Sequence, residues 1–159
     1  MEATRGIIWV HSAAGALCPH IEWAISKALS RPFHFDWLPQ PAEPGMRRAE
    51  TVWFGDISTG EKLASALLNL RHLRFEVTTE PTNTNDGMRW TYTPSLGLHG
   101  TIINRFGDSL IHEERLRSAL KAKNPHAAIH ELLGTAWDDE LEPFRGEYSG
   151  QIKWLHALG

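Results

Sequence analysis

Two short runs of adjacent apolar residues constrain the fold of this chain more than any other feature. They are Ile7-Ile8-Trp9-Val10 and Val52-Trp53-Phe54. A strand that is apolar at successive positions leaves no face for water, so it is typical of the middle of a sheet. We therefore predict two central strands, at residues 6–12 and 49–54.

A helix is predicted directly after the first of these strands. Pro19 suits the first helical position, where its missing N–H costs nothing, and apolar residues follow at helical spacing up to Pro32. Residues 33–37 then alternate aromatic and polar side chains, which predicts a strand with one apolar face.

The same order repeats after the second apolar run. Ser58 and Glu61 have capping-box spacing and open a predicted helix that extends to Leu70. Residues 73–78 alternate again and predict a fourth strand. The order β-α-β-β-α-β over residues 6–80 indicates an α+β protein with a ferredoxin-like, split-βαβ core.

This plan places the two fully apolar strands in the middle of the sheet and the two alternating strands at its edges. Both helices of the plan pack on one face, so residues 81–159 are expected to cover the other face as a β-hairpin and helical extension. We expect a single domain over residues 1–159, because no flexible linker separates the halves. The strand at 73–78 would either pair across a two-fold axis in a homodimer or be covered by residues 88–93.

The second half of the chain is less regular. Strands are predicted at residues 88–92, 98–104 and 110–111, and helices at 113–123 and 125–133. Gly134 is a plausible end for the last of these helices. The terminal segment 151–156 is interpreted as a closing strand or a docked tail.

Composition excludes several classes of protein. Sixteen basic residues against 19 acidic ones give a net charge of −3, which argues against nucleic-acid binding. No apolar run is long enough to cross a membrane, and Cys18 is the single cysteine, so we expect a cytoplasmic protein without a disulfide. The seven tryptophans are dispersed along the chain, which is more typical of core positions than of one binding site.

The loop between the first strand and the first helix contains groups that could bind a ligand. His11, Ser12, Cys18 and His20 lie around a helix N-terminus, whose free N–H groups attract anions. Cys18 would be a candidate nucleophile if one of the histidines served as its base. The alternative is an ordinary strand–helix turn with a buried cysteine.

His126 and His130 are four residues apart on a predicted helix, the spacing of paired metal ligands. A metal would need a third ligand, for which Asp138 and Asp139 are candidates. Two solvated imidazoles explain the pair equally simply, so we expect no metal and no cofactor.

The acidic segment before Arg145 has the most distinctive local composition. Aromatic anchors within a frame of carboxylates are typical of a protein-docking surface, although acidic residues also favour a helix start. The predicted contact residues are Trp137, Asp138, Asp139, Glu140, Glu142, Phe144 and Arg145, together with the distant Trp154.

Four stretches together resemble an actinobacterial family of uncharacterised proteins, domain-of-unknown-function family 3145. They are HSAAGALCPHIEWA (11–24), DWLPQPAEPG (36–45), KLASALLNLRHLRFEVTTEP (62–81) and WDDELEPFR (137–145) with the terminal KWLH. The resemblance extends over nearly the whole chain and implies a cytoplasmic protein. It implies no catalytic residues, and it associates the family with the genomic neighbourhood of fatty-acid synthesis genes.

These observations favour a non-catalytic accessory or regulatory protein that binds another protein. A fatty-acid synthesis or acyl-CoA carboxylase component is the partner that the resemblance suggests. The alternative is a protein or enzyme that binds an anionic or acyl-thioester ligand at the loop formed by residues 11–20. A ferredoxin-like fold does not choose between them, because it serves many functions.

Overall fold

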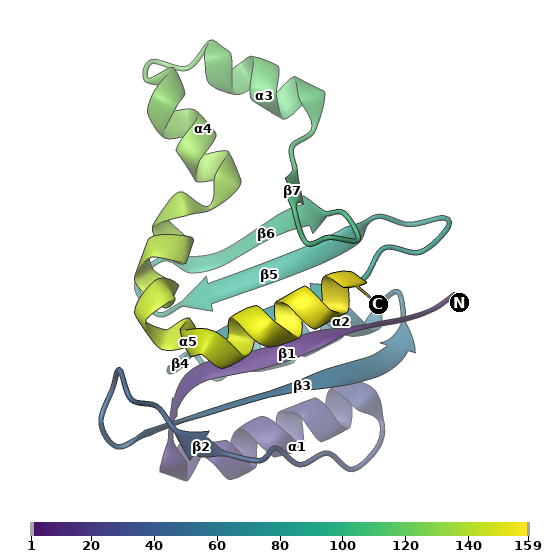
Figure 1. Ribbon diagram of the computed structural model, residues 1–159, viewed down its shortest axis with the longest axis vertical. Coiled ribbons are helices and arrows are strands. Elements are labelled where there is room, and N and C mark those ends of the chain that lie inside the picture. Colours follow the sequence, from purple (N-terminus) through teal and green to yellow (C-terminus); the bar gives the residue numbers. More distant parts are fainter. Residues whose placement is uncertain (1, 159) are drawn as a thin grey trace.

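The computed structural model describes the backbone of residues 2–158 and the side chains of residues 2–146 (Figure 1). Over these residues the chain forms one sheet and five α-helices. The strands are β1 (Ala3–Ala14), β2 (Leu38–Pro39), β3 (Met46–Asp56), β4 (Leu73–Thr79), β5 (Gly87–Thr93), β6 (Gly97–Ile103) and β7 (Ser109–Leu110). The helices are α1 (Cys18–Leu29), α2 (Thr59–Leu68), α3 (Glu113–Leu120), α4 (Pro125–Leu133) and α5 (Thr135–Leu158), and a 3-10 turn, Gly15–Leu17, precedes α1.

The seven strands are antiparallel and follow the order β2-β3-β1-β4-β5-β6-β7. Ile8 in the central strand β1 pairs with Thr51 of β3 on one side and with Val77 of β4 on the other. The predicted α+β class is therefore confirmed. The hairpin β5–β6 extends the sheet beyond β4 instead of covering its face.

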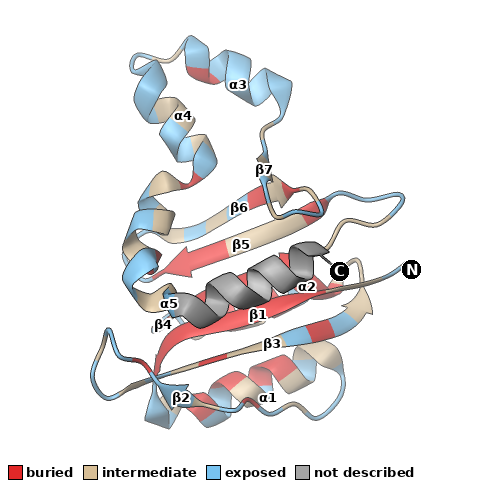
Figure 2. Cartoon of the chain, in the orientation of Figure 1, coloured by how far each residue is buried: buried red, intermediate tan, exposed pale blue. Residues whose placement is uncertain are grey.

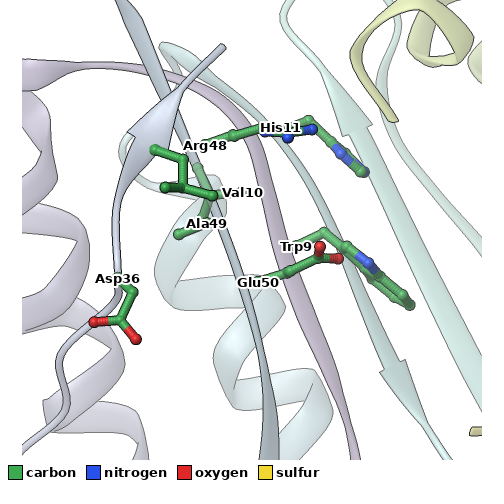
Figure 3. Close-up of a pocket in the computed structure, with 8 residues that line it drawn as sticks. Trp9, Val10, His11, Asp36, Arg48, Ala49 and Glu50 are labelled. Carbon is green, nitrogen blue, oxygen red and sulfur yellow. The ribbon is translucent and has the colours of Figure 1, made fainter. Parts of the chain in front are cut away.

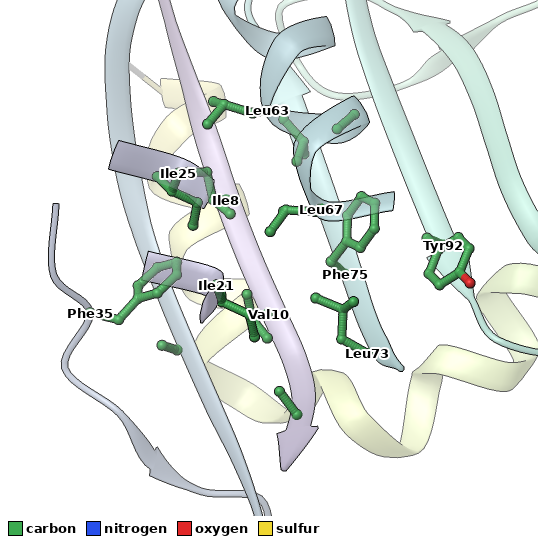
Figure 4. Packing of buried hydrophobic residues seen from close by; sticks show 14 of the residues in the cluster. Ile8, Val10, Ile21, Ile25, Phe35, Leu63, Leu67, Leu73, Phe75 and Tyr92 are labelled. Atoms are coloured by element: carbon green, nitrogen blue, oxygen red, sulfur yellow. The ribbon is translucent and has the colours of Figure 1, made fainter. Parts of the chain in front are cut away.

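Helices α1 and α2 lie on one face of this sheet and enclose an apolar core (Figure 4). Alternate residues of β1, such as Ile8 and Val10, point into this core because side chains alternate between the faces of a strand. The fully buried members from the helices are Ile21, Ile25, Leu63 and Leu67, and those from β4 are Leu73, Phe75 and Val77.

The strand predicted at residues 33–37 is wrong. β2 contains only Leu38 and Pro39, and the preceding residues form an extended segment outside the sheet. Phe35 is buried in the core and packs edge-on against Phe33 and Trp37. The Phe35 N–H donates to the Glu22 carboxylate at 2.7 Å, so a helix side chain replaces the neighbouring strand.

Two expectations about the central and edge strands are also wrong. In β3 only Trp53 of the apolar run is buried, whereas Val52 and Phe54 are exposed on the opposite face. Strand β4 is not an edge strand, because β5 pairs with it, and its residue Glu76 is buried. The expected cover by residues 88–93 is confirmed, which leaves β4 no free edge for a two-fold axis.

Helix α5 crosses the sheet face opposite α1 and α2 (Figure 1). Leu141 of this helix is fully buried, and the helix bends at Gly146, whose φ is 59°. The segment 151–156, predicted as a strand or tail, belongs to α5.

Helices α3 and α4 form a hairpin that projects from the β6–β7 end of the sheet (Figure 2). We call residues 113–133 the arm. The predicted helix at 125–133 is confirmed, with Asn124 as its N-cap and Gly134 (φ 70°) at its end, while α3 stops at Leu120, three residues before its predicted end.

Candidate functional site

A buried cluster of charged side chains lies on the sheet face beneath α5. His11 of β1 and Arg145 of α5 both contact the carboxylate of Glu76 in β4. The His11 Nε2–Glu76 Oε2 distance is 2.7 Å, and Arg145 makes two contacts with the same carboxylate, at 2.7 and 3.1 Å. Arg145 also donates to Asp138 at 2.9 Å, so the cluster links the first strand to the last helix.

Strand pairing explains why these groups meet. Residues directly opposite each other in adjacent strands point to the same face. A continuous row crosses the sheet on the α5 side: Glu50, Trp9, Glu76, Thr91 and His99. A bulge between Val10 and Ser12 brings His11 beside this row, where its ring stacks with that of Trp9.

The electrostatics of the cluster depend on mutual compensation. Burial alone would raise the pKa of Glu76, but the hydrogen bonds and positive charges of His11 and Arg145 hold that pKa well below its usual range. Burial would likewise lower the pKa of Arg145, and the Glu76 and Asp138 carboxylates raise it instead. The Glu76 carboxylate and the Arg145 guanidinium therefore form a buried ion pair.

Polar contacts outside the cluster fix the elements that carry it. The buried side chain of Gln40 donates to the backbone oxygens of His11 and Phe144, at 2.6 and 2.9 Å. The Arg74 guanidinium lies 4.4 Å from the ring centre of Phe144. Helix α5 is thus held to the sheet by backbone, aromatic and charged contacts together.

A cavity of about 170 Å³ adjoins this cluster, between β1, β3 and the segment before β2 (Figure 3). Trp9 and Glu50 lie opposite each other in β1 and β3, and each places a buried polar side-chain atom in the lining of this cavity. Burial raises the pKa of Glu50, against the opposing effects of His11, Trp9 and Arg48. Such groups beside a cavity are typical of sites where proteins bind other molecules.

The four residues of the predicted ligand loop do not come together. His11 belongs to the buried cluster, and Ser12 donates to the Glu43 carboxylate at 2.6 Å. Cys18 is buried and donates to the Ala14 carbonyl, and burial raises the pKa of its thiol, which opposes nucleophilic chemistry. His20 lies on the far side of the sheet, on the exposed surface of α1.

His20 instead lines a groove of about 770 Å³ between α1 and α2. Ala24, Ala28 and Ala66 are small residues in its lining, and the exposed Trp23 lies beside Lys27, whose ammonium is 5.1 Å from the ring centre. A volume of this size falls within the range of small-molecule sites.

Most of the predicted docking segment contacts the chain's own sheet. Trp137 donates from Nε1 to the Gly97 carbonyl at 2.9 Å and stacks on His99, with ring centres 4.7 Å apart. Glu140 accepts a hydrogen bond from Thr93 at 2.9 Å. Phe144, Arg145 and Asp138 have the contacts described above.

Only part of that segment remains on the surface. Asp139 and Glu142 are exposed, and Glu142 lies 3.8 Å from Arg145. The side chain of Trp154 lies outside the described residues. Where the side chains are described, the segment holds α5 against the sheet and also presents a candidate contact surface.

His126 and His130 lie side by side on α4, with ring centres 4.5 Å apart. His130 Nδ1 is 2.8 Å from the Thr135 hydroxyl, and Asp138 is engaged with Arg145 instead. Among the described residues, no group of three or more His, Cys, Asp or Glu side chains is arranged to hold a metal ion.

Three residues of this site, Glu76, Gln40 and Glu50, are not among the predicted site residues. Glu76 alternates with Phe75 and Val77, which places it on the polar face of the predicted strand at residues 73–78. The expectation that residues 81–159 cover this face could have indicated a buried Glu76, since a covered charge needs a partner. The sequence did not identify Arg145 as that partner.

Comparison with known proteins yields a family match alone. No curated protein and no solved structure matches the chain. None of the helices is both long and apolar enough to span a membrane, over the residues that the structure describes. The model of a family described as "Protein of unknown function (DUF3145)" matches residues 7–157, so the chain belongs to that family.

Proposed function

We propose that this chain is a non-catalytic accessory protein that binds a protein partner through the arm, residues 113–133. The observation that carries the proposal is the exposure of the arm's leucines. Leu116, Leu120 and Leu133 are all exposed, and Ala119 is the one buried residue that α3 and α4 contribute. Leucines on a projecting helical hairpin are typical of a surface that a partner covers.

The arm is held firmly at its base. Gly134 lies against the His99 ring, where a Cβ would come within 2.7 Å of a ring carbon, and its positive φ also favours glycine. Trp137, which follows the arm in the sequence, packs against the same His99 ring. A rigid base orients the leucines and lowers the entropy lost on binding.

The predicted docking segment, residues 137–145, has a supporting role in this proposal. Its aromatic residues position the arm, and its exposed carboxylates, Asp139 and Glu142, extend the contact surface next to it. A Trp137→Ala variant would therefore lose partner binding indirectly, because the base of the arm would loosen. The main contact in this proposal is therefore the arm, and the segment has a supporting role.

The partner that the family resemblance suggests, a component of fatty-acid synthesis or an acyl-CoA carboxylase, remains part of the proposal. The exposed leucines of the arm require that partner to offer an apolar groove. Crosslinking can identify it directly.

The test is a photo-crosslinking amino acid placed at Leu120 in the full-length chain, expressed in its native cells. We expect one stoichiometric crosslinked protein, and a Leu116→Asp substitution in the same chain should reduce its yield about tenfold, equivalent to 1.4 kcal/mol. The matched control is Leu96→Asp, since Leu96 and Leu116 are both 39% exposed and Leu96 lies at the β5–β6 turn.

An unchanged yield with Leu116→Asp would contradict the proposal, as would an equal loss with Leu96→Asp. A chain without any crosslinked product at native concentration would also contradict it.

We further propose that residues 6–80 have the ferredoxin-like, split-βαβ arrangement. The support is the strand order β4-β1-β3-β2 with antiparallel neighbours, together with α1 and α2 on one face. The weakness of β2, which has two residues, is the main departure from that plan. An experimental structure would test whether β2 lengthens.

The groove between α1 and α2 favours a second candidate function, the binding of an anionic ligand with an apolar part. Lys27, Lys62 and His20 line it together with Trp23 and a single carboxylate, Glu61. An acyl thioester combines both properties. We expect an acyl-CoA to raise the melting temperature in wild type and in Lys123→Glu, an arm control, and to have no effect in Lys62→Glu.

A further inference from the structure

The end of α1 and the start of α2 lie together at one end of the groove between these helices. Helix α1 follows β1 and α2 follows β3, and because these two strands are antiparallel, the helices run in opposite directions. The Arg31 guanidinium, two residues after α1, donates at 2.9 Å to the Phe54 carbonyl, near the end of β3 and shortly before α2 begins. The residues at each end of the groove can therefore be assigned.

Two lysines give this end of the groove a positive charge. Lys27 lies in the last turn of α1 and Lys62 in the first turn of α2, and both line the groove. Glu61 is the one carboxylate among the described residues of the lining. Asp56, just before α2, accepts hydrogen bonds from the N–H and the hydroxyl of Ser58, at 2.8 and 2.6 Å. The two exposed ammonium groups therefore favour an anionic group of a ligand at this end.

Small apolar residues line the groove beyond the lysines. Ala24 is buried, and Ala28 and Ala66 are half-buried, so the two helices leave room for a ligand between them. Trp23 lies beside these alanines and is 66% exposed, more than any other large apolar side chain in the described part of the chain. An exposed tryptophan next to an apolar surface is typical of a contact residue. This part of the groove therefore suits a narrow apolar chain.

The opposite end of the groove is polar again. His20, in the first turn of α1, and Asn69, directly after α2, are exposed there, and Leu70 is the last apolar residue of the lining. Lys27 and His20 are seven positions apart in α1, which is about 10 Å at 1.5 Å per residue. An extended chain advances about 1.2 Å per bond, so roughly eight carbons span that distance.

We propose that the groove binds one linear acyl chain of at most about eight carbons, with its anionic group between Lys27 and Lys62. The chain lies along the alanines, and the polar side chains of His20 and Asn69 limit its length. This inference rests on the second candidate function, ligand binding in the groove. It adds the orientation of the ligand and the residues that select it by length.

Titration calorimetry of the full chain with acetyl-, hexanoyl-, octanoyl- and lauroyl-CoA tests the limit on length. A fully buried CH₂ raises affinity about fourfold, so a chain with one side open to water should gain about twofold per CH₂. We therefore expect octanoyl-CoA to bind about fourfold more tightly than hexanoyl-CoA, and lauroyl-CoA to gain less than about twofold over octanoyl-CoA. Octanoate in place of octanoyl-CoA distinguishes a fatty acid from a thioester as the source of the chain.

Three variants assign the parts of the ligand to the parts of the groove. His20→Leu extends the apolar lining, so lauroyl-CoA should then bind at least about fourfold more tightly than octanoyl-CoA. Ala66→Phe fills the groove and should weaken octanoyl-CoA at least tenfold, whereas Ala127→Phe, at an exposed alanine of α4, should not. Lys27→Glu should weaken every anionic ligand of the series at least tenfold, and Lys27→Arg should keep the wild-type affinities. Circular dichroism and melting curves confirm that each variant is folded.

The outcomes separate this inference from the function on which it rests. Equal affinities along the series, or a wild-type affinity that keeps rising to lauroyl-CoA, would overturn the limit on length and leave ligand binding in the groove standing. A folded Ala66→Phe variant with unchanged affinity for octanoyl-CoA would place the chain elsewhere and overturn both. The absence of binding by every acyl-CoA and by octanoate would also overturn both.

Discussion

The two faces of the sheet use the same strands in opposite ways. On the face toward α1 and α2, alternate residues such as Phe75 and Val77 form an apolar core. On the face toward α5, the residues between them include Glu76, Thr78 and His11, which are just as buried but polar. Adjacent residues of one strand, Phe75 and Glu76, thus belong to two different kinds of interior.

The difference teaches which kind of contact each face depends on. An apolar face loses stability in proportion to the volume removed, because dispersion and hydrophobic contacts are spread over many atoms. A buried charged face depends on specific partners, because one unpaired charge costs more than the pair contributes. Arg145 is the residue on which the second face depends most.

Among the variants that compare the two faces, Arg145→Ala should lower the free energy of unfolding most. It leaves the buried Glu76 carboxylate with the His11 ring and the Thr91 hydroxyl as its described partners, and we expect the free energy of unfolding to fall by about 3 to 5 kcal/mol. Urea denaturation measures this change. Glu142→Ala is the control, since its carboxylate is highly exposed and 3.8 Å from Arg145, and equal effects of both variants would show that the buried contact does not matter.

Leu67→Ala tests the apolar face. Leu67 is fully buried between α2 and the sheet, so its truncation should lower the free energy of unfolding by about 3 kcal/mol. The exposed Ser65 on the same helix provides the control Ser65→Ala, which should change stability by less than about 0.5 kcal/mol. A cost below about 1 kcal/mol for Leu67→Ala would indicate a loosely packed core.

The contributions of the two faces to stability should also differ in their dependence on pH. The pKa of Glu76 is lowered in the folded chain, so its contribution is fully present above the pKa of an unfolded glutamate, about 4.5, and is lost as the pH falls below it. Glu76→Gln should cost roughly 2 kcal/mol at pH 7, as expected for hydrogen bonds to a charged group.

The stability difference between Glu76→Gln and wild type should shrink as the pH is lowered from 5 toward 2. The difference between Leu67→Ala and wild type should not shrink over this range. Melting temperatures measured across this range would reveal the contrast. A constant difference between Glu76→Gln and wild type would mean that the folded carboxylate titrates like an unfolded one.

Trp137→Phe should have the smallest effect. It keeps an aromatic ring against His99 but removes the hydrogen bond to the Gly97 carbonyl, which is worth about 1 kcal/mol. Trp23→Phe, at an exposed tryptophan, is the matched control and should leave the melting temperature unchanged. A cost for Trp23→Phe as large as that for Trp137→Phe would show that the indole N–H of Trp137 is unimportant.

Local sequence patterns determined much of the fold. The apolar runs and helical spacing located β1, α1, α2 and α4, because capping, proline positions and side-chain periodicity act within a few residues. The same patterns indicated that a further layer covers the second face. They also identified the segment around Trp137 as distinctive, although its partner turned out to include the chain's own sheet.

Tertiary structure decided what local pattern cannot express. The rings of residues 33–37 alternate like a strand, yet they pack into the core without a neighbouring strand, because Glu22 satisfies the Phe35 N–H. Val52 and Phe54 are apolar like the residues of β1, yet their side chains are exposed.

Glu76 shows the physical reason most clearly. A glutamate in an alternating strand has the same local sequence whether its face is open to water or covered. Arg145 is 69 residues away along the chain, and only the path of α5 across the sheet brings its guanidinium to that carboxylate. Periodicity therefore determined which face Glu76 occupies, and long-range packing alone decided that this face is an interior where a buried charge has its partner.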